Sequence, residues 1–587
     1  MSDVIVLAAP GSSAEDIAAS NYEWNPDSLT STIKGLFSKA GNSLEIRPGL
    51  YKGEGEIEIG SNVTVRGSRA IAIPAVKSTI LEPNPSTMAV FSSKRTAAAT
   101  SEKGSYTFRL RSGWGSTGIL LEDLYQAGYV DLKLQGVKNV TIRRCVSHNY
   151  HSGAYPNGVR ANMGYGRTGA FWITGNTDTV LFDQCVSQFS SHHGFLNHGS
   201  LGYWYKNLTY KDCRALYSGS GMLRGEGDQI ARSIAQMPQT QGYGWTDWSC
   251  AFDLCEAGNI DNVLLEDCYA LSGWKTGFYL EPRWDGHKAE HYRLVLRRCV
   301  AEDAGQRASA KYSGESRALM IVRESEASNF YLDAGDLYDC ISRRGFKAGY
   351  YLHAEGMPQN AAKGHTRNMI VQGCTDCGSM YGFYFELPSR KVTFANNSSY
   401  NALNRALMAY KGEDFKATNF RIVSQTPTKS PVMFGRGCLM RKALSRYPSW
   451  QTEVAGRMAN ERTTTTGLTL GGTVGGLQAG TPVFEIANGA VVNGAGRGVI
   501  PSGVSLSRVT DLEVPALCTS GYSTSPPPED PEEPVEEPVI PEVPTNPVVP
   551  GVVHYVGFSA LTAAPLEVRP GEWITIYLRP TVENGEE

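Results

Sequence analysis

The chain has 587 residues, of which 55 are Lys or Arg and 58 are Asp or Glu, and its formal net charge is -3. This length exceeds what one compact core usually serves, so we expect one dominant elongated unit with smaller flanking parts. The nearly balanced charge and the lack of a Lys/Arg stripe argue against a nucleic-acid partner. Without an apolar run of about 18 residues, and without a basic start before Val4, we expect neither membrane insertion nor an uncleaved signal peptide.

The N-terminal part, residues 1–42, precedes a repeated region. A helical pattern near Ser28 to Ala40 comes directly before the phrase Leu44-Glu-Ile-Arg-Pro-Gly-Leu-Tyr51, which has the alternation of a strand. A stack of repeats needs its open end covered. We therefore expect residues 1–42 to form a cap or an attachment segment on the first repeat.

Residues 43–425 repeat one phrase, in which apolar and polar residues alternate before a Cys and a small turn. The period of two in Val140-Thr-Ile-Arg-Arg-Cys145 and in Val263-Leu-Leu-Glu-Asp-Cys268 predicts strands. The cysteines of this phrase are Cys145, Cys185, Cys213, Cys268, Cys299, Cys340 and Cys374. Apart from the longer interval between Cys213 and Cys268, their spacing of roughly 30 to 40 residues is typical of a stacked solenoid.

A second strand follows each Cys strand and opens with a small residue, as in Gly277-Phe-Tyr-Leu and Gly349-Tyr-Tyr-Leu. Since no repeat contains a helix long enough for a crossover, we predict an all-β fold, a parallel β-helix with two strands in each coil. The repeated cysteines then form an internal column of reduced thiols. Only Cys374 and Cys377 have metal-site spacing, without a second pair, so we expect no metal and no other cofactor.

The period is lost after residue 425. Residues 426–522 contain a helical pattern around Met440 to Asn460 and then a Gly/Thr/Val-rich β segment. Residues 523–550 hold ten prolines and seven acidic residues without Lys or Arg, which predicts a stiff, extended linker. We expect residues 551–587 to form a small C-terminal β module.

The first predicted strand carries a family resemblance. Its Pro-Gly-Leu-Tyr51 ending, followed by Val63-Thr-Val-Arg-Gly67, is similar to the opening of pectate-lyase-like right-handed parallel β-helix proteins. That superfamily includes polysaccharide lyases, hydrolases, epimerases and bacteriophage tailspikes. The resemblance covers roughly residues 43–425 and is specific for fold rather than for reaction.

A capped β-helix with a C-terminal module on a stalk resembles a phage tailspike in particular, although no particle-binding head sequence is recognisable. This resemblance implies a virion-surface or extracellular location, a homotrimer, and cell-surface polysaccharide and other virion proteins as partners. Three functions stay open: a spike that cleaves polysaccharide, a glycan-binding module without turnover, and a structural surface protein. A free polysaccharide lyase or epimerase is a further alternative.

The second strands predict which side chains face outward, because alternate residues of a strand point to opposite sides. If Phe278 and Leu280 point inward, Tyr279 and Glu281 point outward. The same register gives one outward column of Asp253, Tyr279, Met320, Tyr351 and Tyr384, and a second of His198, Glu281, His353 and Glu386. Aromatic rings beside carboxylates and imidazoles suit a sugar-binding groove, with Tyr279, Tyr351, His353, Tyr384 and Glu386 as binding residues. Ordinary solvated surface residues would give the same pattern.

Two carboxylates in these columns suit glycosidic chemistry. Coils about 4.8 Å apart and a two-residue offset of about 6.6 Å place Asp253 and Glu281 roughly 8 Å apart. That separation fits an inverting acid/base pair with a water between the two groups. A lyase or epimerase would instead use Arg283, Arg323 or His353 near a uronate carboxylate. Long turns at Tyr150 to Thr168 and Gly225 to Thr246 are expected to wall the groove.

Overall fold

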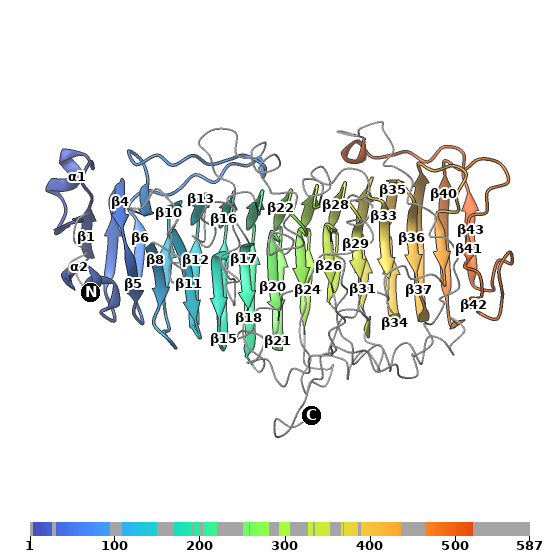
Figure 1. Cartoon of the computed structure of the whole chain (residues 1–587), viewed down its shortest axis with the longest axis horizontal. Helices are drawn as coiled ribbons and strands as arrows, with labels where there is room; N and C mark the ends of the chain where they lie inside the picture. Colours follow the sequence, from blue (N-terminus) through green and yellow to red (C-terminus); the bar gives the residue numbers. More distant parts are fainter. Residues whose placement is uncertain are drawn as a thin grey trace, which may run out of the picture. The chain divides into compact units, whose positions relative to one another are not determined.

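The part of the chain that the structure describes consists mainly of stacked parallel strands (Figure 1). The computed structural model describes residues 4–25, 31–93, 108–128, 130–148, 169–190, 193–198, 203–219, 250–256, 259–280, 293–305, 327–332, 335–352, 366–367, 369–385, 389–435 and 464–519. The chain divides into two units, Met1–Pro528 and Glu529–Glu587, and all described residues belong to the first. Within them, no helix combines the length and the apolarity needed to cross a membrane.

Three ladders of parallel strands run through the stack, two of them in a 28-stranded sheet and one in a 13-stranded sheet. Ladder 1 holds the strands before the repeated Cys: β1 (Val4–Ala8), β3 (Ser43–Ile46), β6 (Thr64–Gly67), β9 (Leu120–Glu122), β12 (Lys138–Arg143), β15 (Thr177–Asp183), β18 (Trp204–Lys211), β21 (Asn259–Glu266), β24 (Leu294–Arg297), β27 (Asp336–Tyr338), β31 (Ile370–Gln372), β34 (Ser389–Ala395), β37 (Gly412–Ser424), β40 (Thr469–Gly475) and β43 (Val504–Arg508). Two short strands pair beside this ladder, β2 (Tyr22–Glu23) with β1 and β30 (Thr366–Arg367) with β34.

Ladder 2 holds the strands after the Cys: β4 (Gly49–Gly53), β7 (Ala89–Ser93), β10 (Leu124–Ala127), β13 (Val146–His148), β16 (Val186–Gln188), β19 (Arg214–Leu216), β22 (Tyr269–Leu271), β25 (Val300–Glu302), β28 (Ile341–Arg343), β32 (Thr375–Cys377) and β35 (Ser398–Ala402), which pairs with β37. Ladder 3 is the 13-stranded sheet: β5 (Gly55–Ile59), β8 (Phe108–Ser112), β11 (Val130–Gln135), β14 (Gly169–Thr174), β17 (His193–His198), β20 (Phe252–Glu256), β23 (Phe278–Leu280), β26 (Phe330–Leu332), β29 (Ala348–Leu352), β33 (Tyr381–Phe385), β36 (Arg405–Ala409), β38 (Val432–Phe434) and β41 (Glu485–Ile486). A separate pair joins β39 (Thr464–Thr465) to β42 (Val491–Val492).

The fold is therefore a right-handed parallel β-helix, as the repeats predict. A typical coil has three strands rather than the two expected from sequence. The additional strands are those of ladder 2, many of which have only three residues, such as Val146–His148 and Val186–Gln188. Three residues are too few to display a period of two, and this explains why the sequence pattern did not reveal them.

A residue in the left-handed backbone conformation forms the tight corner between ladders 1 and 2, directly before the repeated Cys. Arg144, Asp212 and Asp267 have φ angles of 47°, 47° and 57° at this corner. Asp tolerates this conformation because its short side chain bonds locally. The short corner places every repeated Cys at the same position in its coil.

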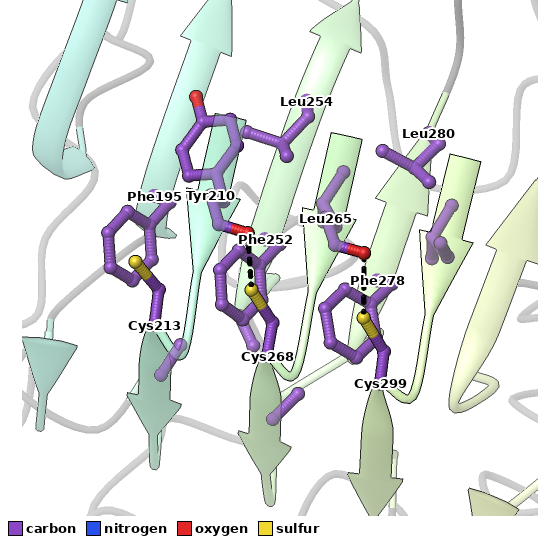
Figure 2. Close-up of a cluster of buried hydrophobic side chains, with 14 of the residues drawn as sticks. Phe195, Tyr210, Cys213, Phe252, Leu254, Leu265, Cys268, Phe278, Leu280 and Cys299 are labelled. Atoms are coloured by element: carbon purple, nitrogen blue, oxygen red, sulfur yellow. Dashed lines mark hydrogen bonds between the residues drawn. The ribbon is translucent and has the colours of Figure 1, made fainter. Parts of the chain in front are cut away.

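The repeated cysteines line the interior, beside a stack of aromatic rings (Figure 2). All seven are buried and free of disulfides, as predicted. Cys268 donates its thiol hydrogen to the carbonyl oxygen of Tyr210 at 3.3 Å, and Cys299 donates to that of Leu265 at 3.4 Å. Burial raises the pKa of the Cys268 thiol well above its ordinary value, so this thiol stays protonated.

The stack extends beyond the expected 43–425 range at both ends. β1 pairs with β3, so strand pairing already begins inside the part that was expected to be a cap. The helices α1 (Ala14–Ala18) and α2 (Ser31–Ser38) follow β1, and α2 falls within the predicted helix. Beyond residue 425, β40 and β43 continue ladder 1 although their sequences lack the Cys phrase. The helix expected around Met440 to Asn460, the linker at 523–550 and the module at 551–587 lie outside the described residues.

The outer face of ladder 2 is covered from the N-terminal side by the segment between β6 and β7 (Figure 1). Ile71 and Leu81 of this segment are buried against Tyr125, Val146 and Val186 of ladder 2. The Tyr125 hydroxyl also donates to the Leu81 carbonyl oxygen at 2.7 Å. This face is therefore an internal packing surface in these coils.

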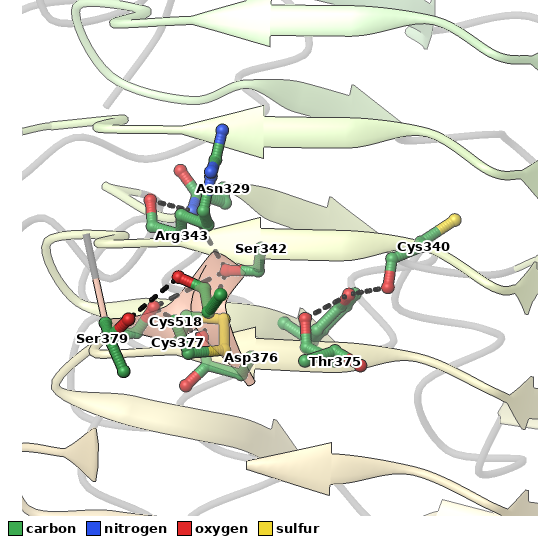
Figure 3. Close-up of a disulfide and its surroundings, with 12 residues drawn as sticks. Asn329, Cys340, Ser342, Arg343, Thr375, Asp376, Cys377, Ser379 and Cys518 are labelled. Carbon is green, nitrogen blue, oxygen red and sulfur yellow. Dashed lines mark hydrogen bonds between the residues drawn. A yellow bond between two sulfur atoms is a disulfide. The ribbon is translucent and has the colours of Figure 1, made fainter. Parts of the chain in front are cut away.

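A disulfide fixes a second cover over ladder 2. Cys377 at the end of β32 is bonded to Cys518 in the short helix η4 (Ala516–Cys518), across a sequence separation of 141 residues (Figure 3). Leu512 and Val514 pack beside this bridge and against Tyr400. The pairing was not predicted, because Cys377 and Cys518 share no local spacing.

Candidate functional site

Most of the long connections of the β-helix join strands of ladder 3 to the neighbouring ladders. Segments 149–168, 220–249 and 306–326 lead into its strands, whereas 281–292, 353–365 and 436–463 follow them. The corner between ladders 1 and 2 is short in the same coils. Binding and catalytic residues concentrate on loops that a rigid scaffold positions, so the outer face of ladder 3 is the candidate site. The expected groove walls, Tyr150 to Thr168 and Gly225 to Thr246, belong to these connections and lie outside the described residues.

Strand pairing aligns one continuous outer column along this face. The aligned residues are Trp172, Leu196, Asp253, Tyr279, Tyr331, Tyr351, Tyr384 and Met408. Phe278 and Leu280 lie in the main core while Tyr279 lies in a separate cluster, which confirms the predicted side-chain directions. Tyr331 takes the position expected for Met320, because β26 begins at Phe330. Met320 itself lies outside the described residues.

The tyrosines of this column are covered, contrary to the expectation of solvent-facing rings. Tyr279, Tyr351 and Tyr384 each have 0% of their surface exposed. Tyr331 stacks on Tyr279 at 4.6 Å between ring centroids and on Tyr351 at 5.4 Å. Alternation in a sequence gives the direction of a side chain, but it does not show whether other residues lie over it. These rings therefore contact one another in this conformation, and none of them offers a free face to a sugar.

A buried group of polar side chains lies at the N-terminal end of the tyrosine column. The Nδ1 atom of His193 is 3.2 Å from Oδ2 of Asp253, and both side chains are 1% exposed. The backbone N–H of Cys250 donates to the same Nδ1 at 3.3 Å. A carboxylate next to an imidazole can orient the ring and exchange a proton with it. Asp253 and His193 are thus two titratable groups in contact on the outer side of ladder 3.

His193, Cys250 and Asp253 are also donors of the types that bind Zn²⁺, and their ligand atoms lie within 4.8 Å of one another. The sequence search for paired cysteines did not find this group, because its members come from two coils. One signal was present: His193 and Cys250 each directly precede the small residue at a strand start, Gly194 and Ala251. These two positions coincide in adjacent coils, since Phe195 pairs with Phe252.

Two buried lysines accompany the tyrosines and were not predicted. Nζ of Lys275 lies 5.9 Å from the ring centroid of Tyr279, and Nζ of Lys347 lies 5.3 Å from that of Tyr381. The two side chains are 4% and 3% exposed. A cation over an aromatic face is stabilised by the ring quadrupole. These lysines place two amino groups beside the outer tyrosines of ladder 3.

Several predicted site residues lie outside the described residues: Glu281, Arg283, Arg323, His353 and Glu386. The side chain of His198 is also outside them. The separation of the Asp253 and Glu281 carboxylates therefore stays a prediction. Of the predicted set, the structure brings together Asp253, Tyr279, Tyr351 and Tyr384 on one face.

Comparison with known proteins gives distant likenesses only. No family model matches the sequence, and no curated protein does. The A-module of mannuronan C-5 epimerase AlgE6 from Azotobacter vinelandii is 12% identical over 81% of this chain and 92% of its own, with a TM-score of 0.33. The gp42 tailspike of Acinetobacter phage vb_AbaP_AS12 is 8% identical over 89% of this chain and 66% of its own, with a TM-score of 0.32. Tailspike protein 3 of bacteriophage CBA120 is 9% identical over 79% and 56%, with a TM-score of 0.34. The likeness of these solved structures, at this level, carries no argument about function.

Proposed function

We propose that this chain is a polysaccharide-binding β-helix protein of the surface-spike type, with its binding site on the outer face of ladder 3. One observation carries the proposal: acid, imidazole, tyrosine and lysine side chains gather on the outer side of ladder 3, whose strands are the ones that the long connections enter or leave along the chain. A binding site needs convergent polar groups on a rigid support, and ladder 3 combines the two.

Direct binding tests this proposal. The full chain would be titrated with purified bacterial capsular polysaccharides and with lipopolysaccharide, and binding would be followed by calorimetry or biolayer interferometry. We expect saturable binding of at least one polysaccharide. If no polysaccharide in a broad panel binds, the proposal is overturned in favour of a purely structural surface protein.

Polysaccharide cleavage is the second proposed activity, and the His193–Asp253 pair favours it. Asp253 would act as one carboxyl group of an acid/base pair, with His193 as its positioning residue and Glu281 as the second carboxyl group. New reducing ends would identify a hydrolase, whereas unsaturated products would identify a lyase. An epimerase would change the uronate composition without shortening the chain.

Asp253→Asn is the decisive variant for cleavage. Binding should stay nearly intact while turnover falls by roughly 10²-fold or more, because the amide keeps the shape but cannot exchange the proton. Asp261→Asn is the matched control, because Asp261 is a half-buried acid on β21 of ladder 1. Equal turnover in wild type and Asp253→Asn would remove Asp253 from the mechanism and leave binding untouched.

A virion-surface location and a homotrimer complete the proposed spike, and both rest on the resemblance to tailspikes. Within the described residues, the exposed large apolar residues are scattered: Val4, Tyr22, Val76, Trp114, Val499, Ile500 and Leu517. Light scattering of the full chain should give three times the chain mass, and a stable monomer would remove the trimer from the proposal.

A further inference from the structure

Trp114 is the most exposed aromatic residue of the described part of the chain. Its side chain is 64% exposed, and it stands at the corner between β8 of ladder 3 and β9 of ladder 1. Burial of an indole is strongly favourable, so a tryptophan left in water at a defined corner invites a functional explanation.

Two glycines of the following coils support the Trp114 ring. A Cβ atom added to Gly136 would lie 3.4 Å from Cε2 of Trp114, and one added to Gly175 would lie 3.0 Å from Cη2. Both glycines have positive φ angles, 58° and 77°, at the corresponding corner of their own coils. The indole therefore lies against turn backbone that carries no side chains, and this contact holds the ring in place.

Tyr203, in the coil that follows the one with Gly175, extends the aromatic surface that begins at Trp114. Its ring centroid is 6.4 Å from that of Trp114, with an interplanar angle of 58°, and the residue is half-buried. The following residue, Trp204, donates its backbone N–H to Oδ1 of the exposed Asn176 at 2.9 Å. This contact fixes the start of β18, and so the position of Tyr203, against the turn that carries Gly175.

The surface around Trp114 and Tyr203 is polar rather than apolar. Asn176 is exposed, Gln135 and Asp178 are partly exposed, and Asp178 accepts a hydrogen bond from Asn207 at 2.9 Å. No other large apolar residue of these described coils is exposed beside Trp114. A protein partner would need a wider apolar patch, whereas one sugar ring needs a single aromatic face with hydrogen-bonding groups around it.

We propose that Trp114 and Tyr203 form a saccharide subsite that stacks on the apolar face of a pyranose unit. The inference rests on the proposed function and deepens it, because it names where a glycan is held away from Asp253. Trp172 and Asp253 belong to one column with Leu196 between them, two strand spacings or about 10 Å apart. The Trp114 ring lies against Gly175, which directly follows β14 and its Trp172, so the subsite adjoins the N-terminal end of this column.

The test compares three variants on a polysaccharide that binds the wild-type chain. Trp114→Ala should weaken binding by roughly threefold to tenfold, and Trp114→Phe should retain most of the affinity, because a ring face remains. Tyr22→Ala is the matched control, since Tyr22 is another exposed aromatic residue, 38% exposed, on β2 near the N-terminus. Thermal unfolding should change little in all three variants, because Trp114 is 64% exposed and Tyr22 is 38% exposed.

The outcomes separate the two proposals. Full affinity of Trp114→Ala overturns the subsite while polysaccharide binding by the chain stands. Equal losses in Trp114→Ala and Tyr22→Ala also overturn it, because the effect would then not belong to this corner. If no capsular polysaccharide or lipopolysaccharide binds the wild-type chain, the proposed function and the subsite fall together.

Discussion

Two stacks of aromatic rings run along opposite sides of ladder 3: phenylalanines on the inner side and tyrosines on the outer side. On the inner side Phe252, Phe278 and Phe330 stack at centroid distances of 4.7 and 5.0 Å. On the outer side Tyr279 and Tyr331 stack at 4.6 Å. The coil spacing sets both distances, so stacking alone does not identify a core. The outer rings carry hydroxyl groups, which suits the polar side of the sheet, and this difference in chemistry agrees with the binding face that we propose.

The largest expected effect comes from a pair of variants on one strand. Phe330 and Tyr331 are neighbours on β26, are 0% and 1% exposed, and point to opposite sides. Phe330→Ala should lower the free energy of unfolding by about 3 to 5 kcal/mol, because it leaves a cavity inside the coil. Tyr331→Ala should cost about 1 to 3 kcal/mol, since it loses ring stacks on an outer face that can close over the gap.

Urea unfolding measures both values, with the wild type as reference. An equal loss for Phe330→Ala and Tyr331→Ala would mean that the outer stack is as rigidly enclosed as the core. The two sides of ladder 3 would then not differ in how tightly their ring stacks are packed.

The repeated phrase was enough to predict the fold and the direction of the ladder 3 side chains. Its alternation placed Phe278 inside and Tyr279 outside, and both placements are correct. Such signals are local, because one strand contains the whole pattern. Burial of Tyr279 was not predictable in the same way, since it depends on residues far away in the chain.

The group of His193, Cys250 and Asp253 shows why the site was harder to predict than the fold. The two coils that supply it are separated by a connection of 220–249, so no sequence motif joins them. The disulfide between Cys377 and Cys518 is a second example, with 141 residues between its ends. Contacts between residues of different coils depend on how many residues each coil contains. The local alternation of apolar and polar residues does not determine that number.

The next largest expected effect is on the pH dependence of the free energy of unfolding, and it comes from a carboxyl group that is buried on ladder 2. Asp376 is 0% exposed and accepts hydrogen bonds from Ser379 at 2.6 Å and Ser342 at 3.1 Å (Figure 3). Burial raises the pKa of Asp376 to about 7. The folded chain therefore holds this proton more tightly than the unfolded chain, in which an Asp has a pKa near roughly 4.

The stabilising effect of that proton is fully present below about pH 4 and is lost as the pH rises toward 7. Between these limits the free energy of unfolding should fall by about 1.4 kcal/mol per pH unit from this group alone. Asp376→Asn should flatten that slope in urea unfolding measured across the range. An unchanged slope in the variant would show that Asp376 is ionised in the folded chain.

The smallest expected stability effect concerns the inner thiols. Cys268→Ser should lower the free energy of unfolding by about 1 to 3 kcal/mol, because a hydroxyl replaces a sulfur atom in an apolar stack. Alkylation of the native chain should leave Cys145, Cys185 and Cys268 unlabelled, as they are 1%, 0% and 0% exposed. Mass spectrometry of the labelled chain checks this, and ready labelling at any of these positions would contradict an enclosed inner side.

Hydrogen exchange of the full chain with a bound polysaccharide tests most directly whether the outer face of ladder 3 carries the function. The account predicts slower exchange in peptides that contain β14, β17 and β20 and in the corner that carries Trp114, with unchanged exchange in ladder 1 strands of the same coils, such as β15 and β21. Protection confined to ladder 1 or ladder 2 peptides, with ladder 3 unaffected, would contradict it.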